Sequence, residues 1–131
     1  MPARIVVVLN EPGFADRVTT ILAGRGYDAV SLPDSMVALT ALEGAQRVEL
    51  LLTCMDYEAG KPNGISLARM ARMRKPGIKV AFVGEPAMAH FTAGLGDLLT
   101  SPVTVLQVVD WITEMTEAPE RPSRSPEYEP G

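Results

Sequence analysis

Three side chains capable of chemistry stand at and just after the end of the apolar run Glu49-Leu-Leu-Leu-Thr-Cys54. Cys54 is the only cysteine, and Asp56 and Glu58 follow it at intervals of two. A cysteine acts as a redox sensor where a positive environment favours its thiolate, and Lys61 is the only basic residue in the segment that follows. We expect Cys54 to be a small apolar filler that ends a buried strand, and a redox sensor stays open as the alternative.

Other residue combinations indicate no catalytic or metal site. Asp56 and Glu58 offer oxygen ligands to a cation, but two carboxylates in an expected loop are usually solvated. His90 is the only histidine and lies in a weakly patterned segment, so no Ser-His-Asp or Cys-His pair is indicated. The segment Gly60-Lys-Pro-Asn-Gly64 lacks the Gly-Lys-Ser/Thr ending of a phosphate-binding loop. We expect no enzymatic activity, no metal and no cofactor.

The composition is typical of one globular domain. The chain has 131 residues, of which 47% are hydrophobic and 5% aromatic, and its net charge is −4. This charge gives no obvious means of binding phosphate backbones or anionic lipids tightly. The apolar run after Arg4 spans only five residues, which is too short for a signal peptide or a membrane span. We expect a soluble, cytoplasmic protein that binds neither nucleic acid nor membranes.

Short apolar runs alternate with segments of helical spacing. Continuous apolar runs predict strands over residues 5–9, 28–32, 49–54, 78–83 and 97–100. Apolar residues spaced three and four apart predict helices over residues 12–24, 35–44, 64–75, 86–93 and 103–115, with a loop over 55–63. The expected inner residues of the second helix are Val37, Leu39, Ala41 and Leu42, and those of the last helix are Leu106, Val109 and Ile112.

Five strands that alternate with five helices predict a parallel sheet covered by helices on both faces. Right-handed crossovers leave few topologies. We predict a single-domain, three-layer α/β/α, flavodoxin-like fold with a five-stranded parallel sheet of order 2-1-3-4-5. The predicted domain spans residues 1–116. Residues 117–131 hold four prolines and four glutamates, so we expect a disordered tail there.

Several landmarks in this layout resemble the receiver domain of bacterial response regulators. Val7-Val-Leu-Asn-Glu-Pro12 resembles the end of the family's first strand, Glu49 to Met55 its third strand, and Asn63-Gly64-Ile65 the opening of its third helix. Pro76-Gly-Ile-Lys-Val80 resembles the entry to the fourth strand. Ser101-Pro102 stands where the family has Lys-Pro with a cis peptide bond. The resemblance covers nearly the whole predicted domain and implies a role in two-component signal transduction.

The resemblance also implies where a phosphorylation pocket would lie. Receivers hold Mg²⁺ with two acidic residues, accept the phosphoryl group on an aspartate, and bind its oxygens with a hydroxyl and a lysine. By position, the acidic pair falls on Leu9 and Asn10, followed by Glu11, the acceptor on Cys54, the hydroxyl on Val83, the lysine on Ser101 and the aromatic switch on Leu98. We predict a pseudo-receiver whose pocket is refilled with neutral side chains and is not phosphorylated.

The position of the acceptor depends on how the third strand is aligned. Counting five residues forward from Glu49 gives Cys54, whereas counting eight residues back from Gly64 gives Asp56. Loop lengths vary more easily than strand lengths, so we place Cys54 at the acceptor position. An atypical response regulator phosphorylated on Asp56 is the alternative.

These features predict a stand-alone signalling protein that acts through contacts with partner proteins of a bacterial pathway. The resemblance places such contacts, or a homodimer, on the face formed by the fourth helix, fifth strand and fifth helix. The expected apolar contacts there are Leu98, Val105, Trp111 and Met115. We expect no DNA-binding output domain after residue 116, so that the output lies in another protein. A flavodoxin-fold protein that binds a small ligand is a further alternative.

A basic stretch near the end of the helix expected over residues 64–75 allows two interpretations. It contains Arg69, Arg72, Arg74 and Lys75, and Lys79 follows. Most such runs are solvated helix faces whose cations suit the negative carboxyl end of the helix. A docking patch for an acidic partner is the alternative.

Overall fold

The computed structural model describes residues 4–44, 47–54 and 63–116. The strands are β1 (Arg4–Val8), β2 (Asp28–Ser31), β3 (Val48–Cys54), β4 (Lys79–Gly84) and β5 (Asp97–Thr100). The helices are α1 (Pro12–Gly24), α2 (Ser35–Glu43), α3 (Gly64–Arg74), the 3₁₀ turn η1 (Pro86–Met88), α4 (Ala89–Thr92) and α5 (Val105–Met115). Every predicted strand and four of the five predicted helices are present, with ends within two residues of the predicted ones. The helix predicted over residues 86–93 is instead the 3₁₀ turn η1 followed by the short helix α4. Residues 55–62 of the predicted loop lie outside the described residues.

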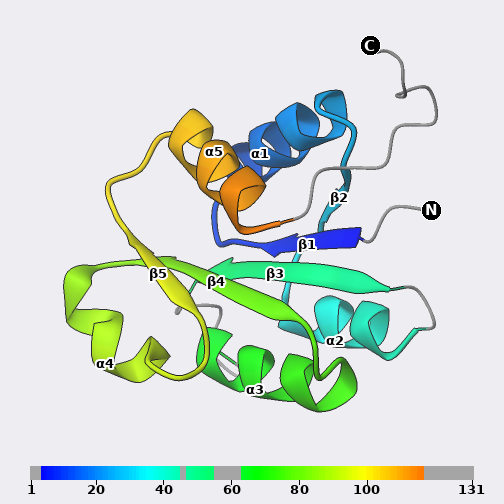
Figure 1. The fold of residues 1–131 in the computed structure, drawn as a ribbon, viewed down its shortest axis with the longest axis vertical. Helices are drawn as coiled ribbons and strands as arrows, with labels where there is room; N and C mark the ends of the chain where they lie inside the picture. Colours follow the sequence, from blue (N-terminus) through cyan, green and yellow to red (C-terminus); the bar gives the residue numbers. More distant parts are fainter. Residues whose placement is uncertain (1–3, 45–46, 55–62, 117–131) are drawn as a thin grey trace, which may run out of the picture.

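The five strands form one parallel sheet in the order β2-β1-β3-β4-β5, which confirms the predicted flavodoxin-like fold. Helices α1 and α5 cover one face of the sheet, and α2, α3 and α4 cover the other (Figure 1). Because the strands are parallel, the carboxyl ends of β1, β3, β4 and β5 all meet at one edge of the sheet.

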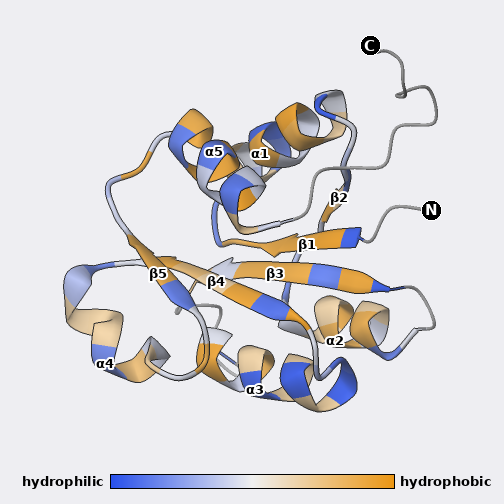
Figure 2. Ribbon diagram, viewed as in Figure 1, coloured by the Kyte–Doolittle hydropathy of each residue, from blue (hydrophilic) through white to orange (hydrophobic). Residues whose placement is uncertain are grey.

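The inner strands are apolar on both faces. Four consecutive residues of β1, Ile5 to Val8, are fully buried, because alternate side chains enter opposite layers. Ile5 and Val7 pack with α1 and α5, whereas Val6 and Val8 pack with α2 and α3. Figure 2 shows the resulting apolar colouring along β1 and β3. This double burial explains why the sequence of β1 is a continuous apolar run rather than an alternating one.

The buried face of α2 differs from the predicted one. Ser35, Ala38 and Leu42 are the buried residues, whereas the side chain of Val37 is 41% exposed. The helix is apolar at most positions, so its sequence gives little periodicity from which to choose a face. Asp34 is the N-cap of the helix. Its carboxylate accepts hydrogen bonds from the backbone N–H groups of Met36 and Val37 at 2.9 and 3.0 Å.

The buried face of α5 is also rotated relative to the prediction. Val108, Val109 and Ile112 are buried, and Leu106, expected on the inner side, is 55% exposed. Three of the predicted interface residues, Val105, Trp111 and Met115, are half-buried and pack against the core layer beneath α1 and α5. Leu98 of β5 is half-buried against the opposite layer. These four residues therefore contribute to the core, and the exposed apolar side chain of α5 is Leu106.

The basic stretch at the end of α3 connects neighbouring elements. Arg74 forms an ion pair of 3.2 Å with Glu43 of α2, and the Lys75 ammonium donates to the carbonyl oxygen of Gly44 at 2.8 Å. The side chain of Arg72 donates to the carbonyl oxygen of Leu95. Lys79 pairs with Glu49 at 3.7 Å and donates to the carbonyl oxygen of Met115 at 2.8 Å. These internal partners favour a structural role for the stretch over a docking patch.

The predicted domain ends lie partly outside the described residues. Residues 1–3 and the predicted tail, 117–131, are not among them, so the boundaries at 1–116 and the disorder of the tail stay predictions. Within the described ranges, none of the helices has the length and apolar character needed to cross a bilayer.

Candidate functional site

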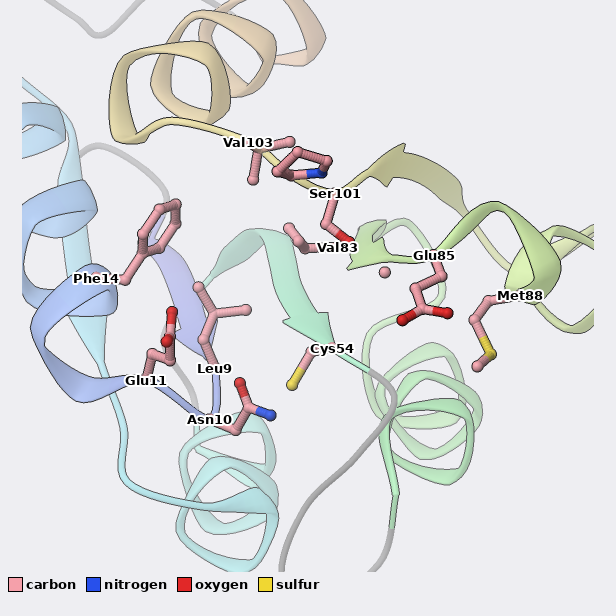
Figure 3. A pocket seen from close by; sticks show the side chains of 12 residues that line it. Leu9, Asn10, Glu11, Phe14, Cys54, Val83, Glu85, Met88, Ser101 and Val103 are labelled. Atoms are coloured by element: carbon pink, nitrogen blue, oxygen red, sulfur yellow. The ribbon is translucent and has the colours of Figure 1, made fainter.

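A pocket of about 650 Å³ opens at the edge of the sheet where β1, β3, β4 and β5 end. Figure 3 shows its lining from close by. The lining residues are Leu9, Asn10, Glu11, Phe14, Cys54, Val83, Gly84, Glu85, Met88, Ser101, Pro102 and Val103. Six of the seven residues predicted for the degenerate pocket are among them, and the seventh, Asp56, lies outside the described residues.

The inner wall of the pocket is set by strand register. Cys54 pairs with Val83 in the alignment of β3 with β4. The pairing of β1 with β3 ends at Val8 and Thr53, so the next residues along the two chains are Leu9 and Cys54. Leu9 and Cys54 are each 8% exposed, and Val83 is half-buried. Three neighbouring strands thus present two aliphatic side chains and a thiol to the bottom of the pocket.

The two sides of the pocket come from the segments that leave β1 and β5. Asn10 and Glu11 connect β1 to α1, where Pro12 occupies the first helical turn. On the other side, the Ser101 backbone N–H donates to the carbonyl oxygen of Gly84 at 2.8 Å. The Ser101–Pro102 peptide bond is cis, as the sequence resemblance implies.

Sequence reasoning missed one charged residue of the pocket. Glu85 follows β4 directly, and its carboxylate points toward the space in front of Cys54 (Figure 3). Together with the predicted Glu11, it gives the pocket two carboxylates beside the neutral side chains at the positions that the resemblance assigns. The signal lay in the sequence, because Glu85 follows Val83 and Gly84 where β4 must end.

The described lining contains no lysine or arginine, and Ser101 occupies the position that the resemblance assigns to the lysine. The charged groups of the lining are therefore both negative. Within the described ranges, no three acidic, histidine or cysteine side chains gather closely enough to hold a metal ion. Such a pocket attracts cations and repels a phosphate dianion, unless a charge from elsewhere compensates.

Leu98 and His90 lie away from the pocket lining. Leu98, predicted at the aromatic switch position, packs into the layer that contains α2 and α3. His90 is exposed on α4, and its ring lies 4.0 Å from the ring of Phe91. Neither side chain is placed to act on a ligand at the carboxyl edge of the sheet.

Comparisons with known proteins agree with the observed topology. No family model matches the chain. It is 36% identical over 72 residues to the DNA-binding response regulator MtrA of Mycolicibacterium smegmatis, covering 55% of this chain and 30% of that protein. It is 26% identical over 113 residues to the probable transcriptional regulatory protein TcrX of Mycobacterium tuberculosis, covering 82% and 47%. The chain thus spans less than half the length of either relative.

Solved structures show the same fold at lower sequence identity. A CheY-like response regulator receiver domain from Methanospirillum hungatei aligns with a TM-score of 0.75 at 21% identity, covering 88% of this chain and 94% of that one. The chemotaxis protein CheY4 of Vibrio cholerae aligns with a TM-score of 0.76 at 15% identity, covering 88% and 100%. With the strand order, these likenesses show that the described chain has the fold of response regulator receiver (CheY-like) domains.

Proposed function

We propose that this protein is a receiver-like signal-transduction module that acts through protein contacts, without aspartyl phosphorylation and without enzymatic activity. The observation that carries the proposal is the inner wall of the pocket. Leu9 directly follows β1, and Cys54 and Val83 lie on the adjacent strands β3 and β4. These are the positions that the family resemblance assigns to a metal ligand, the acceptor and a hydroxyl.

The chemistry of phosphoryl transfer explains why this wall argues against phosphorylation. A carboxylate nucleophile, a dication that neutralises the incoming group, and a lysine and a hydroxyl that bind its oxygens must act together. The side chains of Leu9 and Val83 offer no ligand atoms, and that of Asn10 supplies one neutral amide oxygen. The carboxylates of Glu11 and Glu85 add negative charge without a neighbouring cation in the described lining.

Without phosphorylation, we expect the protein to transmit a signal through contacts of its surface with other proteins. The names of the two relatives connect those proteins to gene regulation. The elements of the α4–β5–α5 face carry two exposed large apolar side chains: Phe91 of α4 is 52% exposed, and Leu106 of α5 is 55% exposed. We place partner contacts, or a homodimer, on this face, because exposed apolar side chains of this size favour interfaces.

The proposal is tested by incubating the full chain with acetyl phosphate and Mg²⁺ and measuring its intact mass. We expect no phosphorylated species, while a typical receiver domain treated in parallel becomes labelled. Stoichiometric labelling that hydroxylamine removes would overturn the proposal, because an acyl phosphate is sensitive to that nucleophile.

Phosphorylation on Asp56 is the second candidate, since Asp56 stands eight residues before Gly64, where α3 begins. The same experiment separates the two candidates. If Asp56 is the acceptor, the wild-type chain is labelled and Asp56→Asn is not. If the first proposal is right, neither chain is labelled.

A further inference from the structure

We propose that the pocket binds an arginine side chain of a partner protein, with its guanidinium group between Glu11 and Glu85. The inference rests on the proposed function, because it names the chemistry by which a partner would engage the degenerate pocket. It adds a second contact to the face formed by α4, β5 and α5, at a different place on the molecule.

The charge of the pocket favours a cation. Glu11 and Glu85 are both exposed, and they lie on opposite sides of the pocket with Cys54 between them (Figure 3). Among the described residues, neither carboxylate has a side-chain hydrogen bond or ion pair. Both acceptors are thus available to a ligand, and the described lining supplies no lysine or arginine that competes for them.

The apolar part of the lining favours an arginine side chain over a small, strongly hydrated cation. Leu9, Val83 and Met88 supply aliphatic and thioether surface, and the ring of Phe14 stands beside Glu11 (Figure 3). A guanidinium group is flat and weakly hydrated, and it stacks on aromatic rings while it donates to carboxylates. The methylene stem of arginine would cover the aliphatic surface.

The size of the pocket agrees with this occupant. A volume of about 650 Å³ lies in the range of pockets that hold small molecules, so a whole arginine side chain and part of its backbone have room. An anionic side chain would meet two carboxylates of its own sign. A neutral apolar side chain would cover the wall but leave both carboxylates unpaired.

The test is a titration of the isotope-labelled full chain with a blocked Gly-Arg-Gly tripeptide, followed by amide chemical shifts. We expect saturable shifts at Cys54, Val83 and Ser101 with a Kd of about 1 mM, as suits a single anchored side chain. The matched peptide with citrulline in place of arginine, which has the same shape without the charge, should give no saturable shift. Glu11→Gln and Glu85→Gln should each weaken arginine binding about fivefold.

Glu114→Gln is the control variant, because Glu114 is exposed near the end of α5, at the opposite edge of the sheet. It should bind the peptide as the wild type does. Equal shifts with arginine and citrulline, no shifts with either, or shifts with Mg²⁺ alone that the peptide does not displace would each overturn the inference. No phosphodonor is present, so a negative result here leaves the outcome of the acetyl phosphate experiment unchanged.

Discussion

Cys54 and Val83 lie opposite each other in the parallel pairing of β3 with β4, and both line the pocket at the carboxyl edge of the sheet. A thiol and a branched aliphatic side chain thus occupy the centre of the site. This pair packs with Leu9, which directly follows β1 and belongs to the same core layer as Cys54. The bottom of the pocket is consequently an extension of the core under α1 and α5, and the charged groups stand at its sides.

Cys54→Asp should destabilise the protein and should not create a phosphorylation site. The new carboxylate would stand at a position that is 8% exposed, beside Leu9 and Val83, and burial without a partner costs about 2 kcal/mol or more. Urea unfolding measures this loss. Cys54→Ala, the matched control, should lose only about 1 kcal/mol. A Cys54→Asp chain that keeps its stability and accepts phosphate from acetyl phosphate contradicts the account.

The native thiol of Cys54 should react slowly with a disulfide reagent. Its side chain is buried, and the charged side chains of the described lining are carboxylates, which disfavour a thiolate. The rate should rise by at least tenfold when the chain is unfolded in urea. A native rate equal to the unfolded rate would favour the redox-sensor alternative.

Gly96→Ala should be strongly destabilising. A β-carbon at this position would lie 2.2 Å from the backbone carbonyl oxygen of Val80, which cannot move without disturbing β4. We expect a loss of about 3 kcal/mol in urea unfolding. Gly77→Ala is the control, because a β-carbon there meets nothing within 4 Å, and it should change the free energy of unfolding by less than about 1 kcal/mol. Similar effects of the two substitutions would show that the close approach at Gly96 is wrong.

Two leucine-sized residues of α5 should respond differently to truncation. Ile112 is fully buried, so Ile112→Ala should cost about 2–5 kcal/mol. Leu106 is 55% exposed, and Leu106→Ala should cost less than about 1 kcal/mol. Thermal or urea unfolding of the two variants compares them directly. If Leu106→Ala proves the more costly, the orientation of α5 described above is incorrect.

The sequence predicts the positions of strands and helices more accurately than it predicts which face of a helix is buried. The buried strands were predictable because Ile5 to Val8 form an unbroken β-branched run, which only a doubly covered strand accommodates. The faces of α2 and α5 were predicted incorrectly at Val37 and Leu106. Both helices carry apolar residues on more than one side, so the packing of the whole layer decides which side is buried.

For the pocket, the sequence likewise predicts which strand ends come together, but it does not predict every charged residue of the lining. Leu9, Cys54, Val83 and Ser101 could be brought together from sequence because they end parallel strands, and such ends share one edge of a sheet. Glu85 lies one residue beyond β4, and Val83 is the only residue from this end of the strand in the predicted pocket. The structure adds the carboxylate of Glu85 to that of Glu11.

The most direct test of the central claim is a titration of the isotope-labelled chain with Mg²⁺ and beryllofluoride, which mimics a phosphoryl group on a carboxylate. We predict that the amide signals of Cys54, Val83 and Ser101 keep their positions up to millimolar concentrations of both reagents. Saturable shifts of these signals that require both reagents together would show that the pocket still holds a dication and a phosphoryl-like group, and would contradict the account.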